Sequence, residues 1–164
     1  MSVDPEVLWQ PDADRVAATT VDRFRRSVRP EAGDTDEMWA WSVREPGSFW
    51  RALWEWAGVI GEPGERDVET ADDFWRWRFL PDATLNVAEN LLAEREGTNG
   101  DAIIERRENG AGRATTWNDL RSDVAAMAAW MRSVGVEPGD RVAAWMAHVS
   151  ETIVGFLAAS SIGA

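Results

Sequence analysis

The sequence predicts an α/β protein whose first half is helical and whose second half alternates strands with helices. Seven of the eleven tryptophans lie between residues 39 and 77, where proline and glycine break the chain into short helical segments. After residue 80, runs suited to strands alternate with helix starts that carry capping residues. We therefore expect two domains, residues 1–80 and residues 81–164.

Composition limits the class of protein. Of the 164 residues, 45% are hydrophobic and 28% are charged, which is ordinary for a globular chain. The net charge is −12, which argues against nucleic acid or an anionic membrane as a partner. All 17 basic residues are arginine, so a catalytic lysine within these residues is excluded. No window approaches the roughly 18 apolar residues of a membrane span. With no cysteine and no apolar leader, we expect a cytoplasmic protein without disulfides.

The elements of the first half follow from spacing and helix-breaking residues. A helical stripe, expected in two pieces, recurs every four positions at Val16, Thr20, Phe24 and Val28. It should end before Pro30, and residues 36–43 should form a short helix with acidic residues at its start. Pro46 suits the first turn of the next helix, which Gly58 and the turn at residues 61–64 should end.

The tryptophans allow two interpretations. Those in the dense stretch are Trp39, Trp41, Trp50, Trp54, Trp56, Trp75 and Trp77. They could form a stacking platform for sugars or bases, or they could pack the core and interfaces of short helices. Trp50 and Trp54 are four residues apart and share a helix face. We favour packing, because buried aromatic side chains usually dominate core energetics.

The second half begins with a helix and a hairpin. Asn86 and Glu89 form a capping-box-like start, with asparagine in the usual place of serine or threonine, and the helix should end near Gly97. An Asn-Gly pair then predicts a tight turn between two strands. The expected hairpin consists of strand residues 102–107, loop residues 108–112 and strand residues 113–117.

The longest helix and one more strand–helix unit follow. Thr116 and Asp119 open the helix. Its apolar stripe is Leu120, Val124, Met127, Met131 and Val134. Residues 142–146, which follow Arg141, are continuously apolar and predict a buried strand over residues 141–146. Ser150 should cap a last helix that runs to about Ile162. A helix in this position normally returns to a parallel strand, so we expect an incomplete sheet.

Residues with chemical potential are few. His148 is the single histidine and lies in a loop; it could act as a general base, but a structural role is favoured. The other candidates are the pairs Asp72 with Asp73, Glu105 with Glu108, and Arg106 with Arg107. In so acidic a chain we expect the carboxylate pairs to lie on solvated faces, and the arginine pair is too small for a phosphate site. The glycines at 97–100 and 110–112 predict turns rather than a phosphate-binding loop.

Several segments carry a family resemblance. Residues 79–92 read Phe-Leu-Pro-Asp-Ala-Thr-Leu-Asn-Val-Ala-Glu-Asn-Leu-Leu, and residues 115–120 read Thr-Thr-Trp-Asn-Asp-Leu. Residues 134–143 contain Gly-Val-Glu-Pro-Gly-Asp-Arg-Val, and the tryptophan-rich residues 38–58 precede all three. Together they resemble the start of an acyl-CoA synthetase of the adenylate-forming superfamily. Residues 79–92 favour its acetoacetyl-CoA synthetase branch, whereas the other motifs indicate the superfamily alone.

The resemblance implies an ATP-dependent acid–thiol ligase. In the family, acetoacetate reacts with ATP to form an acyl-adenylate and pyrophosphate, and the CoA thiol then takes the acyl group, with Mg²⁺ as a further cofactor. It also implies a cytoplasmic enzyme of lipid and fatty acid metabolism. The fold would be an N-terminal extension, residues 1–80, followed by a truncated AMP-binding domain, residues 81–164.

The family's phosphate loop, adenine site, ribose-binding aspartate and catalytic lysine lie further along the chain in relatives. No residue here matches them, so we expect no catalytic, cofactor-binding or metal-binding residue. Residues 147–151 also depart from the family's Pro-Asn-x-Pro-Glu loop and keep only Glu151. An inert, marginally stable N-terminal fragment is therefore expected. The alternatives are a fragment of an acetyl- or propionyl-CoA synthetase and a non-catalytic, tryptophan-rich binding module.

Overall fold

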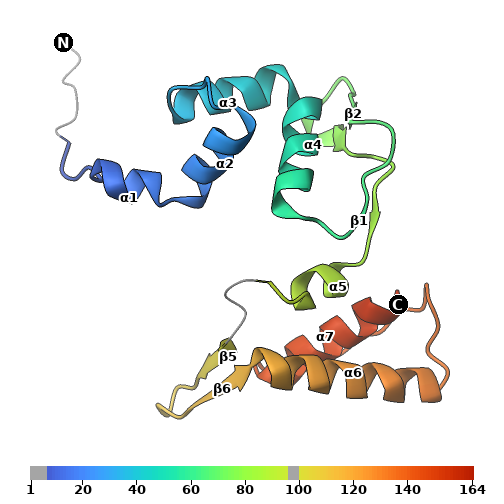
Figure 1. The fold of residues 1–164 in the computed structure, drawn as a ribbon. Coiled ribbons are helices and arrows are strands. Elements are labelled where there is room, and N and C mark those ends of the chain that lie inside the picture. The colour runs from blue at the N-terminus through green and yellow to red at the C-terminus, as the bar shows by residue number, and fades with distance from the viewer. Residues whose placement is uncertain (1–6, 96–99) are drawn as a thin grey trace. The chain divides into compact units, whose positions relative to one another are not determined.

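The computed structural model describes residues 7–95 and 100–164. The chain divides into two compact units, Met1–Ala83 and Thr84–Ala164. Figure 1 shows helices throughout and a strand hairpin in the second unit. The predicted domains, residues 1–80 and 81–164, place their boundary close to this division, and their identity as an extension and a truncated AMP-binding domain remains a proposal.

Four helices form most of the first unit. They are α1 (Ala13–Ala17), α2 (Thr20–Val28), α3 (Thr35–Arg44) and α4 (Pro46–Ala57). Asp12, Thr19 and Asp34 cap the first three, each accepting a hydrogen bond from a backbone N–H three residues on. Pro46 begins α4, and Gly58 ends it in the left-handed conformation. The predicted two-piece stripe and the two later helices are therefore confirmed.

Aromatic side chains fill the core of the first unit. Phe24 and Trp41 are buried, together with Ala32 and Met38. Phe49 meets both rings edge to face, at centroid distances of 5.9 Å from Phe24 and 5.4 Å from Trp41. Trp56 adds an edge contact to Phe24 at 5.2 Å. Edge-to-face pairs of this kind add to the stabilisation that burial provides.

The packing interpretation of the tryptophans is confirmed for part of the set. Trp41 lies in the core, and Trp50 contacts Phe49 and Phe79 with ring centroids 5.5 and 5.2 Å apart. Trp39 and Trp75 are exposed, so packing does not account for them. The stretch is a small aromatic core with exposed members at its surface.

The rest of the first unit is loop-rich. It contains β1 (Gly61–Glu62), β2 (Val68–Glu69), a 3₁₀ turn η1 (Phe74–Arg76) and β3 (Arg78–Phe79). β2 and β3 pair antiparallel, with Val68 opposite Phe79. Arg66 binds Asp82 through its side chain, at 2.9 Å from Nε and 2.5 Å from Nη2. This pair lies beyond the end of the short ladder and ties its two flanks together.

The second unit follows the predicted order. Its elements are β4 (Thr84–Leu85), α5 (Val87–Leu92), β5 (Asp101–Arg106), β6 (Gly112–Thr116), α6 (Trp117–Ser133) and α7 (Ser150–Ile162). Asn86 caps α5 by accepting from the Glu89 N–H at 3.1 Å, as predicted. The predicted end near Gly97 is wrong, since α5 ends at Leu92 and Gly97 lies outside the described residues.

The core of the second unit forms where α5, α6 and α7 meet. α6 and α7 lie side by side, with the β5–β6 hairpin at one end of α6 (Figure 1). The buried apolar residues are Ala88, Leu120, Val124, Ala128, Met131, Val154, Leu157, Ala158 and Ala159. The predicted stripe of α6 supplies three of them, which confirms its core-facing side. Asn86 adds a tie to the end of α7, since its side-chain amide donates to the Ser160 carbonyl at 2.8 Å.

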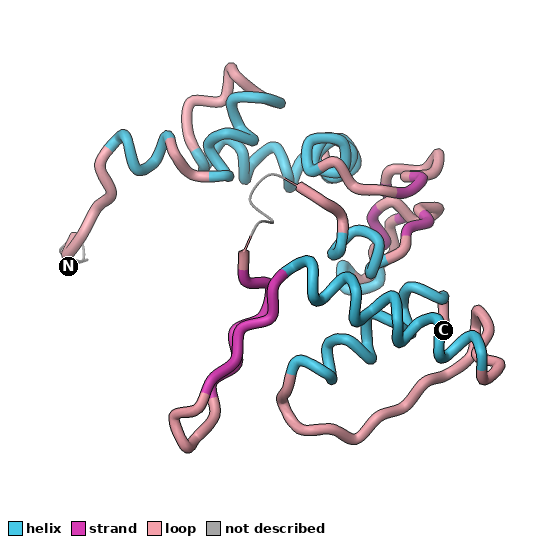
Figure 2. Tube along the Cα trace, turned by 60° about the horizontal axis from the view of Figure 1, so that its bottom comes forward, coloured by secondary structure: helices cyan, strands magenta, loops and turns pink. Residues whose placement is uncertain are grey.

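The predicted strand at residues 141–146 is wrong. These residues are extended, exposed and free of regular structure in the long loop that joins α6 to α7 (Figure 2). A strand exists only through hydrogen bonds to a neighbour, and β5 and β6, the longer strands among the described residues, pair antiparallel with each other. The apolar sequence therefore has no ladder to join. Within residues 7–95 and 100–164, no helix is both long and apolar enough to cross a membrane.

Candidate functional site

Polar side chains from the hairpin meet the start of α7. The group consists of Glu105 on β5, Arg113 and Thr115 on β6, and Ser150 and Glu151 at the start of α7. We call these five residues the hairpin–α7 cluster. Glu105, Thr115 and Ser150 are buried, whereas Arg113 and Glu151 are exposed. The cluster links two strands to a helix that begins more than 30 residues later in the sequence.

Glu105 is the centre of the cluster. Its exposed fraction is 7%, and its Oε1 accepts a hydrogen bond from the Ser150 backbone N–H at 2.6 Å. Its Oε2 lies 3.3 Å from Arg113 Nε, an ion-pair distance without hydrogen-bond geometry. The carboxylate thus meets the positive end of α7, where helices leave N–H groups without partners. The prediction that Glu105 lies on a solvated face is wrong, because its side chain is buried, and the contact with the start of α7 compensates the cost of that burial. Glu108 is exposed, as predicted.

Ser150 does not cap α7 as predicted. The N-cap residue is Val149, whose side chain cannot accept a hydrogen bond, and Ser150 is the first helical residue. Its hydroxyl turns inward to the Thr115 hydroxyl, at 3.2 Å between the two oxygens. A glutamate from a distant strand therefore takes over the capping role that sequence spacing assigned to a neighbouring serine.

The exposed side of the cluster is an ion pair. Arg113 Nη2 lies 2.9 Å from Glu151 Oε1. The backbone N–H of Glu151 itself and the Arg113 guanidinium hold the pKa of the Glu151 carboxyl below its usual value, and the same pair raises the pKa of Arg113. A cavity of about 230 Å³ opens here, and Asp119 and Asp123 of α6 also line it. One arginine among three acids does not favour a phosphate.

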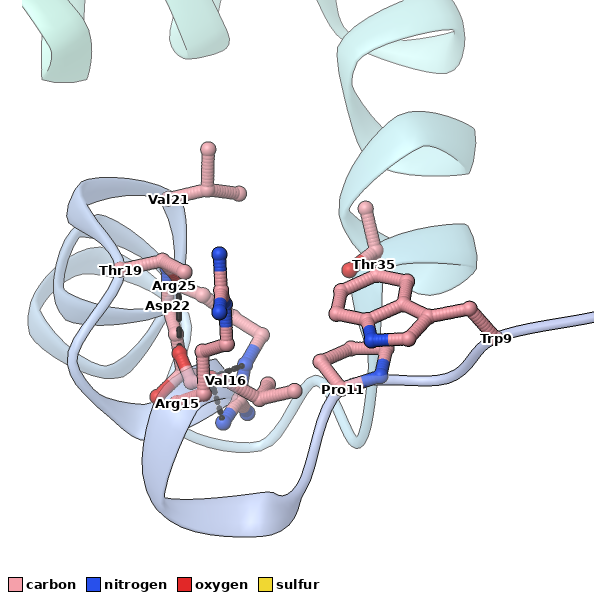
Figure 3. A pocket seen from close by; sticks show the side chains of 9 residues that line it. All are labelled: Trp9, Pro11, Arg15, Val16, Thr19, Val21, Asp22, Arg25 and Thr35. Atoms are coloured by element: carbon pink, nitrogen blue, oxygen red, sulfur yellow. Dashed lines mark hydrogen bonds and ion pairs between the residues drawn. The ribbon is translucent and has the colours of Figure 1, made fainter.

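The first unit has a larger cavity, of about 390 Å³ (Figure 3). The Trp9 indole lies beside Pro11 and Thr35, across from side chains of α1 and α2. Arg15 stands over the Trp9 ring, with its guanidinium carbon 5.4 Å from the ring centroid. Arg25 is bound to Asp22 and to the Ala32 carbonyl, so its donors are largely satisfied. The walls are mostly apolar and bring no acid–base pair to a reacting atom.

The structure does not gather the remaining candidate residues into a site. His148 is exposed in the loop before α7. Asp72 is exposed, and Asp73 forms a loose ion pair with Arg76 at 3.7 Å. Arg107 lies 3.9 Å from Glu105, and Arg106 is exposed on the other side of β5. Gly110 forms a turn with φ near 79°, while residues 97–99 lie outside the described part of the chain.

Sequence reasoning overlooked Glu105 as a structural centre, although a signal for it existed. Side chains alternate faces along a strand. Ile103 and Glu105 therefore share one face of β5, and Ile103 packs against the core. A glutamate two residues from a core isoleucine is an inward-facing charge, which needs a partner when buried.

The chain is also similar in sequence to known proteins. Residues 92–164 match the sequence profile of the family described as AMP-binding enzyme. The acetoacetyl-coenzyme A synthetase of Rhizobium meliloti (strain 1021) is 41% identical over 96% of this chain and 24% of the relative. The malonamoyl-CoA synthetase vrtB of Penicillium aethiopicum is 31% identical over 97% of this chain and 23% of the relative.

A solved structure gives the same match. The acetoacetyl-CoA synthetase from Streptomyces lividans superposes with a TM-score of 0.84 and 32% identity, over 97% of this chain and 26% of that chain. The family match covers residues 92–164, which are a little less than half of the chain. Over nearly its whole length, the chain is a homologue of acetoacetyl-CoA synthetases, which confirms the resemblance and the α/β fold class. The chain spans about a quarter of the length of the curated relatives that it matches.

Proposed function

We propose that this sequence belongs to an ATP-dependent acetoacetate–CoA ligase. The observation that carries the proposal is the 41% identity to the Rhizobium meliloti acetoacetyl-coenzyme A synthetase over 96% of the chain. In such a reaction, the acetoacetate carboxylate attacks the α-phosphate of ATP and releases pyrophosphate. The CoA thiol then attacks the resulting acyl-adenylate and releases AMP. A cytoplasmic location and a role in lipid metabolism belong to this proposal.

In the proposed enzyme, the described residues have a structural role and the catalytic groups lie elsewhere. No group of three or more histidine, aspartate or glutamate side chains suited to a metal ion occurs within residues 7–95 and 100–164. Mg²⁺ is usually held by one or two carboxylates together with substrate phosphates, and we assign no step through it to these residues. The hairpin–α7 cluster fixes the start of a helix, and the Ser150 hydroxyl in its cavity lies 3.2 Å from the Thr115 hydroxyl. We propose that the chemistry of the whole enzyme resides in other sequence.

Acyl specificity is the finer part of the proposal. The malonamoyl-CoA synthetase relative is 31% identical over the same region, so similarity here is shared between enzymes named for different acyl groups. Residues 79–92 favour the acetoacetate branch. Acetate and propionate remain alternative substrates, and a tryptophan-rich binding module remains the non-enzymatic alternative because Trp39 and Trp75 are exposed.

The test is acyl-dependent exchange of pyrophosphate into ATP, measured on the full-length protein whose gene carries this sequence. We expect acetoacetate to support faster exchange than acetate, propionate or malonamate. A faster rate with one of the other acids would contradict the acyl assignment. Absence of exchange with all four would contradict the ligase proposal. The purified 164-residue chain is the matched control and should give no exchange above the blank.

A further inference from the structure

The loop of the β5–β6 hairpin contains an Asn-Gly pair, Asn109 and Gly110, and both residues are exposed. Glycine after an asparagine leaves the asparagine side chain open to attack by the next backbone nitrogen, because glycine has no Cβ to obstruct the approach. The space around Gly110 is open as well. A Cβ added there would have no atom of the described residues within 4 Å apart from its own residue and its chain neighbours.

One hydrogen bond prepares the Asn109 side chain for that attack. Its amide oxygen, Oδ1, accepts from the Ala111 backbone N–H at 3.0 Å. This bond holds the side chain against the turn and polarises the carbonyl, so the amide carbon Cγ is more electrophilic. When a nucleophile adds to Cγ, negative charge develops on Oδ1. The Ala111 N–H is already placed to stabilise that charge.

A second hydrogen bond restrains the nucleophile. The Gly110 backbone N–H donates to the Arg107 carbonyl at 2.9 Å. The nitrogen can attack only after it has lost its proton to solvent base, so the bond to Arg107 has to open first. Residues 106–114 are all exposed, and local opening is most frequent in exposed loops of this kind. The turn therefore slows the attack without preventing it.

The other asparagines within the described residues lack this combination. Asn86, Asn90 and Asn118 precede valine, leucine and aspartate, whose side chains obstruct the next backbone nitrogen. Asn90 is also held by its amide nitrogen, which donates to the Asn86 carbonyl at 3.0 Å. Asn99 precedes a glycine but lies outside the described part of the chain. Asn109 is thus the described asparagine best placed to react.

We propose that Asn109 is a site of spontaneous modification, at which the Gly110 nitrogen converts asparagine to aspartate and isoaspartate at a rate set by opening of the turn. The deprotonated nitrogen forms a bond to Cγ. The bond from Cγ to Nδ2 breaks, and Nδ2 takes a proton from water and leaves as ammonia. The product is a five-membered succinimide ring.

Water then opens the ring by adding to one of its two carbonyl carbons. Addition at Cγ breaks the bond to the Gly110 nitrogen and gives aspartate. Addition at the main-chain carbonyl carbon of Asn109 gives isoaspartate, in which the backbone runs through the side chain. In either case one amide and one water become one carboxylate and one ammonium ion. No substrate of the proposed ligase takes part, so this proposal does not depend on that function.

The modification acts on the hairpin that carries the hairpin–α7 cluster. Each event adds a negative charge to the loop, and isoaspartate also lengthens the backbone by one carbon. The added length should disturb pairing at the end of the ladder, where Arg106 lies opposite Gly112 and Glu105 opposite Arg113. We therefore expect the isoaspartate form to unfold at lower urea concentration than Asn109→Asp, which adds the charge alone.

The test is peptide mapping by mass spectrometry after incubation at pH 8 of the full-length protein whose gene carries this sequence. We expect the peptide that contains Asn109 to gain the mass of an amide-to-acid exchange and to contain both aspartate and isoaspartate. Peptides that contain the other described asparagines should change at least roughly tenfold more slowly. The peptide with Asn99 is mapped separately.

Two variants and one change of conditions isolate the mechanism. Asn109→Gln keeps an amide but needs a six-membered ring, and should slow conversion roughly tenfold or more. Glu108→Ala is the matched control, since it changes an exposed neighbour, and should convert within roughly twofold of the parent rate. Unfolding in guanidinium chloride should accelerate conversion at Asn109 about fivefold, the factor by which one hydrogen bond of ordinary net strength keeps the Gly110 N–H closed.

Four results would overturn the proposal. The first is absence of conversion at Asn109 in the folded protein. The second is equal conversion of Asn109→Gln and the parent, and the third is aspartate as the only product, since both would indicate direct hydrolysis by water. The fourth is an equal rate in the folded and unfolded protein, which would show that the turn does not set the rate.

Discussion

Glu105 illustrates how one buried charge can fix the position of a helix. Its carboxylate receives the Ser150 N–H at 2.6 Å and lies 3.3 Å from Arg113 Nε. Glu105→Ala leaves the buried Ser150 N–H without an acceptor, which costs about 1–3 kcal/mol. We therefore expect this variant to unfold at lower urea concentration, measured by circular dichroism.

Glu108→Ala is the matched control, because it removes an exposed glutamate three residues away. It should change the free energy of unfolding by no more than about 0.5 kcal/mol. Equal stability of Glu105→Ala and Glu108→Ala would show that the Glu105–Ser150 contact does not stabilise the second unit.

Gly64 is a position where a side chain has no space. A Cβ there would lie 2.5 Å from Asp82 Cβ and 2.8 Å from the Asp82 carbonyl carbon, and φ is +76°. Gly64→Ala should therefore destabilise the first unit by more than the roughly 1–2 kcal/mol that a left-handed conformation alone costs alanine. Gly58→Ala isolates that conformational cost, since φ is +61° and an added Cβ would have no atom within 4 Å apart from its own residue and its chain neighbours. Thermal unfolding midpoints that fall equally for both variants would contradict the steric argument.

The Arg66–Asp82 pair makes part of the stability depend on pH. Hydrogen bonds from Arg66 lower the pKa of Asp82 from 3.8 to about 2. Because the folded pKa is depressed, the stabilisation is complete above about pH 4 and is lost as pH falls through 2. We expect the difference in urea midpoint between the parent chain and Asp82→Asn to shrink from pH 5 to pH 2. A constant difference over that range would mean that the pair does not carry this pH dependence.

At the scale of elements, Thr116 shows that a single capping residue can mark the start of a helix. Its Oγ1 accepts the Asp119 N–H at 3.1 Å and starts the longest helix, α6. Thr116→Ala should lower the free energy of unfolding by about 1 kcal/mol, whereas Thr116→Ser keeps the hydroxyl and should cost a few tenths. Chemical denaturation followed at 222 nm measures both. An alanine variant as stable as the serine variant would show that the cap contributes little.

Elements of this kind could be predicted because their determinants lie within a few residues of one another. The caps at Asn86 and Thr116, the proline at the start of α4 and the Asn-Gly turn of the hairpin are all local. The stripe of α6 is also readable, because one face of a helix repeats every three to four residues. The helix ends were less predictable: α5 stops at Leu92, where no glycine marks its end.

The wrong predictions have a common physical cause, which is dependence on distant partners. Residues 141–146 have the composition of a buried strand, but a strand requires a neighbour that no described residue supplies. Ser150 has the right residue type for a cap, yet Glu105, 45 residues earlier, reaches the helix start instead. Leu85 is 46% exposed, whereas the smaller Ala88 three residues later is fully buried. These outcomes depend on contacts between residues that are far apart in the sequence, and local sequence does not specify such contacts.

For the whole molecule, strong negative charge accompanies exposed apolar surface. With 17 arginines against 29 acids, the net charge is −12, and the isoelectric point is about 4.5. Trp145, Phe156 and Met146 are exposed. Mutual repulsion should keep the chain dispersed at pH 8, and this repulsion disappears near the isoelectric point. Apolar contact between copies should then dominate.

We therefore expect light scattering by the 164-residue chain to rise steeply as the pH falls from 8 towards 4.5. At pH 7, added salt should have the same effect more weakly, because a Debye length of about 8 Å at physiological ionic strength screens repulsion between surfaces. Trp145→Asp removes the apolar side chain that is most exposed among the described residues and places a charge within residues 141–146, so it should shift the onset of association to lower pH. Trp75→Asp makes the same change in charge at an exposed tryptophan of the first unit and serves as the control. If both substitutions shift the onset equally, total charge alone governs association, and residues 141–146 have no special part in it.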